Sequence, residues 1–149
     1  SQKHRVNGLK RRIVIDGQGN FLSITCGRAN RHDQTFAVKT IDRVIVGKRI
    51  RRPKRLGADK GYDSNALRKD LQERHIVPCI VRRVNNRTAV TVAEIKESRY
   101  CRKRWKIERS FTWLNNNRRV DRFMERSTRT YQGFCYMAFI KFYLKKLAN

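Results

Sequence analysis

Carboxylates are scarce in this sequence, so the few that could perform chemistry stand out. Only 12 Asp and Glu residues accompany 37 Lys and Arg residues. Glu108 is the one acid in the basic and aromatic stretch 100–115, and Asp59 follows a short apolar run at 56–58. Hard cations such as Mg²⁺ take oxygen ligands, usually a few carboxylates together with water and substrate phosphate. The two acids therefore predict a carboxylate-held Mg²⁺ site, which Mn²⁺ could also fill.

A site of this kind supports phosphodiester chemistry. Two Mg²⁺ ions about 3.5–4 Å apart activate a water or a 3′-hydroxyl and stabilise the leaving oxygen. The sequence contains no nucleophile elbow, P-loop or dinucleotide fingerprint that would indicate another reaction. The alternative for Glu108 is an exposed ion pair with Arg104, four residues earlier on the same side of a helix. Such pairs are common and weak, so the stretch 100–115 by itself favours the ion pair.

The segments that would position Asp59 are typical of an α/β unit. A strand at 56–58 leads into Asp59, a helix capped by Asp63 or Ser64 follows, and a second strand is predicted at 76–81. Strand, helix and strand in this order indicate parallel pairing. Asp59 would then lie at the carboxyl end of a strand, where α/β folds tend to place their sites.

A hairpin is predicted upstream, over residues 11–25. Its strands lie at 13–15 and 21–24, and Asp16-Gly17 and Gly19-Asn20 provide the positive φ angles of a tight turn. Asp16 is therefore interpreted as a turn residue rather than a catalytic group.

The other expected elements are helices and loops. Asp33 would cap a helix that begins near Gln34, and residues 48–55 (KRIRRPKR) indicate a loop that is either a solvated linker or a phosphate contact. Residues 82–97 are polar and irregular. Residues 131–144 are nearly all apolar and, at 14 residues, too short to span a bilayer, so we predict a helix buried in the core.

The charge balance indicates the kind of partner. The 149 residues suffice for one domain with a real core, and they carry a formal charge of +25. A polyanion would relieve this repulsion, and nucleic acid is the obvious one because binding releases its counterions. An anionic membrane is the competitor, but no segment sets cations opposite a sustained apolar stripe. Four widely spaced cysteines give no zinc-ligand pattern.

Four segments, in order, resemble landmarks of bacterial insertion-sequence transposases of the DDE class. They are GLKRRIVIDGQGN, GRANRHD, GADKGYDS and KRWKIERSFTWLNNNRR, and the resemblance runs from about Asn7 to the C-terminus. It implies an α/β, ribonuclease H-like fold, with a mixed sheet flanked by helices, and metal-dependent cutting and joining of DNA. It also implies that Asp59 and Glu108 are the second and third acids of a catalytic, metal-binding triad.

The insertion-sequence transposases that this chain resembles carry the pattern Y-x2-R-x3-E-x6-K on the helix of their third acid. This chain follows the pattern in part. Arg104 and Glu108 match, whereas Cys101 stands at the tyrosine position and Asn115 at the lysine position. Arg104 would hold backbone phosphate beside the scissile bond, with assistance from Asn115. Further predicted DNA contacts are the basic residues near the two acids: Lys60, Lys103, Lys106 and Arg109.

The resemblance places the first acid of the triad on a strand before the hairpin. That strand would precede Ser1, because Asp16 and Asp33 correspond to family positions outside the triad. We therefore expect one catalytic domain over residues 1–149 that is truncated at its N-terminus and impaired as an enzyme.

The expected function is cleavage of transposon ends and strand transfer into target DNA. The resemblance suggests a homodimer on double-stranded DNA in the bacterial cytoplasm, associated with the nucleoid, and the basic runs at 48–55 and 116–122 would bind duplex without sequence preference. Two alternatives stay open. One is a non-catalytic, basic nucleic-acid-binding module or an inactive transposase remnant, and the other is a nuclease of the same fold without a joining step.

Overall fold

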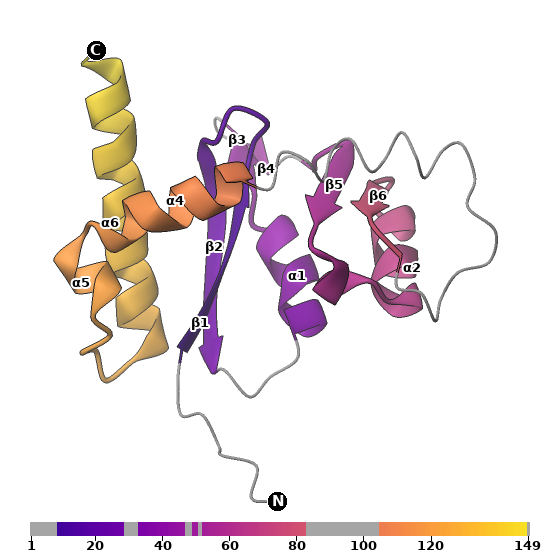
Figure 1. The fold of residues 1–149 in the computed structure, drawn as a ribbon, viewed down its shortest axis with the longest axis horizontal. Helices are drawn as coiled ribbons and strands as arrows, with labels where there is room; N and C mark the ends of the chain where they lie inside the picture. Colours follow the sequence, from indigo (N-terminus) through magenta and orange to yellow (C-terminus); the bar gives the residue numbers. More distant parts are fainter. Residues whose placement is uncertain (1–8, 29–32, 47–48, 51, 83–104, 149) are drawn as a thin grey trace, which may run out of the picture.

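The computed structural model describes residues 9–28, 33–46, 49–50, 52–82 and 105–148, and strands and helices alternate along the chain (Figure 1). The strands are β1 (Leu9–Ile15), β2 (Phe21–Arg28), β3 (Ile45–Val46), β4 (Arg49–Ile50), β5 (Arg55–Ala58) and β6 (Val77–Ile80). The helices are α1 (Asp33–Ile41), the 3-10 helix η1 (Lys60–Tyr62), α2 (Asn65–Glu73), α4 (Trp105–Asn115), α5 (Arg118–Asp121) and α6 (Thr128–Leu147).

The strands pair in three separate two-stranded sheets within the described residues. The β1–β2 and β3–β4 pairs are antiparallel, and the β5–β6 pair is parallel. The mixed α/β class expected from the sequence is therefore present, but these strands do not join into one continuous mixed sheet. Helix α1 lies between the β1–β2 hairpin and the β5–β6 pair in Figure 1.

The predicted hairpin is confirmed, with strands that extend beyond the predicted bounds. Asp16 organises its turn, because its Oδ1 accepts hydrogen bonds from the backbone N–H of Gln18 (2.8 Å) and Asn20 (2.9 Å). Its Oδ2 accepts a third, from the side-chain amide of Asn20, at 2.7 Å. Gly19 adopts a positive φ of 91°, whereas Gly17, which we also expected to do so, does not.

Removing the Asp16 carboxylate is expected to lower the free energy of unfolding by about 1 kcal/mol at neutral pH, because hydrogen bonds to a partly buried carboxylate are lost. Partial burial acts to raise the pKa of Asp16, but hydrogen bonds from the Asn20 side chain and from the turn backbone outweigh it, so the pKa lies below its ordinary value. A lowered folded pKa means that this stabilisation is complete above the ordinary pKa and is lost as the pH falls through the lowered one.

Urea denaturation of the chain and of Asp16→Ala, from neutral pH down to about pH 2, measures this dependence. The stability difference should shrink at the acid end. Gln18→Ala in the same turn is the control and should change stability by less than about 0.5 kcal/mol. If the difference in free energy of unfolding between the unchanged protein and Asp16→Ala stays constant with pH, the ionised carboxylate does not have this stabilising role.

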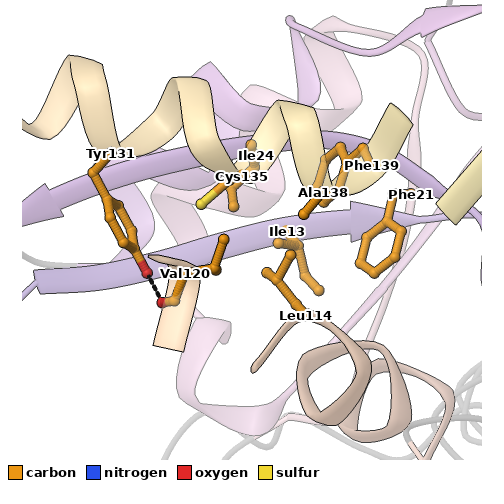
Figure 2. Packing of buried hydrophobic residues seen from close by; sticks show 9 residues of the cluster. All are labelled: Ile13, Phe21, Ile24, Leu114, Val120, Tyr131, Cys135, Ala138 and Phe139. Atoms are coloured by element: carbon orange, nitrogen blue, oxygen red, sulfur yellow. Dashed lines mark hydrogen bonds between the residues drawn. The ribbon is translucent and has the colours of Figure 1, made fainter. Parts of the chain in front are cut away.

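The main core lies between the hairpin and the C-terminal helices. Figure 2 shows Ile13 and Ile24 of the hairpin facing buried residues of α4, α5 and α6. The ring of Phe21 stacks on that of Phe139 with centroids 4.3 Å apart. Tyr131 donates a hydrogen bond to the Val120 carbonyl, and burial raises the pKa of Tyr131 to about 12. Aromatic packing thus fixes α6 against β2.

The prediction that residues 131–144 form a helix is confirmed within α6, but the expectation that this helix is buried in the core is wrong for one side of it. Four α6 residues are buried: Tyr131, Cys135, Ala138 and Phe139. Four others are exposed by 59 % or more: Met137, Ile140, Leu144 and Leu147. The reason is that the buried residues of α6 face one core cluster, formed with β1, β2, α4 and α5. None of the described helices is both long and apolar enough to cross a bilayer.

The predicted strand–helix–strand unit is confirmed as β5, α2 and β6. Ser64 rather than Asp63 caps α2, because its Oγ accepts the Leu67 N–H at 3.1 Å. Leu67 and Leu71 are buried in a second core cluster, which also includes Ile41 of α1. This cluster connects the parallel pair to α1.

Two other predictions need correction and two lie outside the described residues. Helix α1 begins at Asp33 itself, so Asp33 is its first residue rather than the residue before it. The run 48–55 is not entirely loop, because Arg49–Ile50 forms β4 and β5 begins at Arg55. The irregular segment predicted at 82–97 falls almost entirely outside the described residues, as does the expected start of the glutamate helix at 100–104.

Candidate active site

Asp59 lies where the sequence predicts it, immediately after β5. Its backbone is extended (φ −67°, ψ 156°), and its Oδ1 accepts the Lys60 N–H at 2.8 Å, so Asp59 caps η1. Its carbonyl accepts the Tyr62 N–H at 2.9 Å. Asp59 and Lys60 are both exposed. The turn therefore presents a carboxylate and a cation to solvent at the carboxyl end of a parallel strand pair.

A buried ion pair holds the chain in place directly after η1, the turn that follows Asp59. Asp63, which follows η1, pairs with Arg68 of α2 (Oδ1 to Nε, 2.9 Å), and their side chains are only 2 % and 11 % exposed. Arg68 also donates through Nη2 to the Ile80 carbonyl at 2.7 Å. The pair thus ties the segment that follows Asp59 to α2 and to the end of β6. This is the structural role of the second aspartate in GADKGYDS.

Glu108 lies in the first turn of α4, on an exposed side of the helix. A carboxylate in the first turn interacts favourably with the helix dipole. Other residues of α4, among them Ile107, Phe111 and Leu114, pack against the main core and fix the helix. The end of α4 that carries Glu108 is the end nearer to β5 in Figure 1. The predicted helix therefore exists and leaves its acid at the surface.

The predicted DNA contacts have different surroundings. Lys106 donates to the Gly17 carbonyl and so connects α4 to the hairpin turn. The Arg109 guanidinium lies 5.3 Å from the centroid of the exposed Trp105 ring. Asn115 ends α4, and its Oδ1 is buried without a hydrogen-bond partner among the described residues. Lys103 and Arg104 lie outside the part of the chain that the structure describes.

The donor types fit a hard divalent cation, because Asp59 and Glu108 both offer carboxylate oxygen. Within the described ranges, however, no group of three or more His, Cys, Asp or Glu side chains is arranged to hold a metal ion. Two carboxylates alone leave most coordination positions to water and substrate phosphate, as is usual for Mg²⁺ in phosphoryl-transfer sites. Asp59 and Glu108 therefore have the donor chemistry that such a site requires.

The structure also gathers three basic side chains that the sequence did not single out. Lys39, Arg43 and Arg129 line a common cleft of about 730 Å³, although Arg129 is far from the other two in the sequence. No run of charge marks them, since Lys39 and Arg43 lie four positions apart and Arg129 lies in a different helix. These side chains line one cleft only because α1 and α6 both pack against β2.

Comparison with known proteins gives consistent matches. Residues 1–142 match the family described as Transposase DDE domain. A relative from Burkholderia cepacia, named as a candidate transposase for insertion sequence element IS402, is 32 % identical over 118 residues. The match covers 76 % of this chain and 52 % of the relative, so the chain spans about half the length of the curated relative. No solved structure matches the chain significantly.

Proposed function

Since this chain belongs to the transposase DDE domain family, we propose that residues 1–149 form part of the catalytic domain of an insertion-sequence transposase. In this proposal the fold is ribonuclease H-like and the glutamate helix is an altered form of the Y-R-E-K type. The intact protein would cleave transposon ends and join them to target DNA.

The observation that carries the proposal is the position of Asp59 at the carboxyl end of β5 in a member of this family. Asp59 and Glu108 would hold Mg²⁺, with Mn²⁺ as an alternative. When bound, the metal lowers the pKa of the attacking water or 3′-hydroxyl and neutralises charge at the phosphate. The chain's own part is positioning, because η1 and the Asp63–Arg68 pair fix the Asp59 carboxylate and core packing fixes α4.

Binding of DNA is supported by charge. The chain carries a net charge of +25, and Lys60 and Arg109 are exposed beside the two acids in sequence. These cations would neutralise backbone phosphates near the scissile bond, together with Arg104 and Lys103. We further propose that two copies act on paired transposon ends in the bacterial cytoplasm, close to the nucleoid.

A joining assay tests the proposal and separates it from its alternatives. The intact protein is given a duplex with a pre-cut 3′-hydroxyl transposon end, a supercoiled target and Mg²⁺. We expect a joined product that disappears with EDTA and with a 3′-dideoxy end, which has no attacking hydroxyl.

Other outcomes of this assay would overturn the transposase assignment. Cleavage without any joined product would indicate a nuclease of the same family. DNA binding that responds to neither Mg²⁺ nor loss of both acids, with no cleavage or joining, would indicate a non-catalytic binding module.

A further inference from the structure

A polar cleft runs along β2 between α1 and α6, on the hairpin rather than on the β5–β6 pair. It is open to solvent and has a volume of about 730 Å³. Its lining comes from β2, from α1 and the turn after it, and from the first half of α6: Thr25, Cys26, Phe36, Lys39, Arg43, Thr128, Arg129, Gln132, Gly133 and Tyr136. None of these residues belongs to β5, η1 or α4, so the cleft is separate from the candidate active site.

Two helices hold the cleft open along β2. On one side, Ser23 of β2 donates to the Thr40 carbonyl of α1 at 2.6 Å, and the hydroxyls of Thr25 and Thr40 share a hydrogen bond of 2.6 Å. On the other side, Tyr136 of α6 donates to the Ile24 carbonyl at 3.3 Å. Helices α1 and α6, which form the two walls, are thus both hydrogen-bonded to β2. These contacts fix the position of each wall and therefore the space between them.

The charged residues among the described lining are all basic. Lys39, Arg43 and Arg129 are exposed, and none of the described lining residues is acidic. Asp42, the acid next to Arg43, is engaged elsewhere, because Arg74 binds it with two hydrogen bonds of 3.2 Å. Arg129 also lies in the first turn of α6, where the helix dipole adds partial positive charge. An anion in the cleft would therefore meet cations on both walls.

We propose that this cleft binds the phosphate backbone of a DNA segment, apart from the DNA held at Asp59 and Glu108. The inference rests on the proposed function and extends it, because the proposed joining reaction involves both a transposon end and target DNA. Backbone contacts of this kind position DNA without reading its sequence. The hydroxyl and amide groups of Thr25, Thr128 and Gln132 provide hydrogen-bonding partners for phosphate and sugar oxygens.

The first test compares two variants that lose the same net charge. Arg43→Gln/Arg129→Gln removes one cation from each wall, and Lys69→Gln/Lys145→Gln removes two exposed cations outside the lining. Duplex affinity is measured without metal at several salt concentrations. For the cleft variant we expect about tenfold weaker binding and a salt slope smaller by about two, since each lost phosphate contact contributes about 0.9. The control should change affinity less than about threefold, and equal losses in both variants would overturn the proposal.

The second test asks directly what occupies the cleft. A benzophenone amino acid at Gln132, on the cleft wall, or at Lys69, outside it, is irradiated with duplex DNA. Crosslinking of DNA at Gln132 alone, unaffected by millimolar inorganic phosphate or free nucleotide, supports a DNA site. Loss of the crosslink with those competitors indicates a free-phosphate site, and capture of an acidic peptide in place of DNA indicates a protein partner, so both results overturn the proposal.

The same crosslink separates this inference from the proposed function. Glu108→Gln should crosslink as well as the unchanged chain. If the protein crosslinks to DNA but neither cleaves nor joins it, the transposase assignment is wrong and the cleft proposal stands. If the protein cleaves and joins DNA but does not crosslink at Gln132, the proposal that the cleft binds DNA is wrong and the transposase assignment stands.

Discussion

Replacing Glu108 with Gln in the intact protein is expected to lower the rate of Mg²⁺-dependent cleavage of transposon ends by about a thousandfold or more, and Asp59→Asn should do the same. An amide has nearly the shape of a carboxylate but lacks its negative charge, so it cannot replace it as a ligand of a hard cation. Both side chains are exposed, and neither belongs to a core cluster, so the fold should survive. The measurement is single-turnover nicking of labelled duplex.

Binding and charge controls make this result specific. Glu73→Gln in α2 removes the same charge from another exposed glutamate and should leave cleavage unchanged. Without metal, Glu108→Gln and Asp59→Asn should bind duplex at least as well as the unchanged protein, because each removes one repulsive charge. Full cleavage activity in Glu108→Gln would refute its assignment as a metal ligand.

The elements around Asp59 could be predicted because their signals are local. A short apolar run, an acid and a capping serine lie in succession from 56 to 64, and the fold follows them as β5, Asp59 at its end and the cap of α2. The hairpin follows in the same way from the hydrogen bonds of Asp16 to its own turn. In both cases neighbouring residues determine the backbone conformation. The local prediction therefore agrees with the structure that the packed chain adopts.

Features that depend on distant partners could not be predicted. The apolar residues of α6 surround the helix, and nothing in them indicates that only one side would be covered by the rest of the chain. The cleft has the same origin, since Arg129 meets Lys39 and Arg43 only after α6 has packed along β2. The assignment of Glu108 as a ligand also depends on more than its own helix, which alone favours an exposed ion pair. The pairing with Asp59 and the resemblance support the assignment, which stays a prediction.

The ion pair of Asp63 and Arg68 should be the most sensitive polar contact for stability. Asp63→Ala leaves the Arg68 guanidinium in a nearly dry site without its carboxylate, and we expect the free energy of unfolding to fall by about 3–5 kcal/mol. Urea denaturation of the unchanged protein and of Asp63→Ala measures this difference in the free energy of unfolding. Asp42→Ala breaks the more exposed contact with Arg74 (side chains 37 % and 23 % exposed) and should lose about 1 kcal/mol or less.

A double variant keeps this prediction testable even if Asp63→Ala folds poorly. Asp63→Ala/Arg68→Met removes both charges and should be more stable than Asp63→Ala alone, because no unpaired cation is left in the interior. If the double variant instead loses the sum of the two single effects, the pair does not act as a unit and the buried-charge explanation is wrong.

The same pair should affect catalysis through the position of Asp59. Arg68→Lys keeps the charge, but an ammonium lacks the planar fork with which Arg68 reaches both Asp63 and the Ile80 carbonyl. Since Asp63 directly follows η1, a looser contact should let the Asp59 turn move, and misplacement by about 1 Å can cost 10²-fold in rate. We therefore expect Arg68→Lys to cleave transposon ends far more slowly at temperatures where it is fully folded, while its duplex affinity stays unchanged. Normal cleavage by the folded variant would show that Asp59 is positioned by η1 alone.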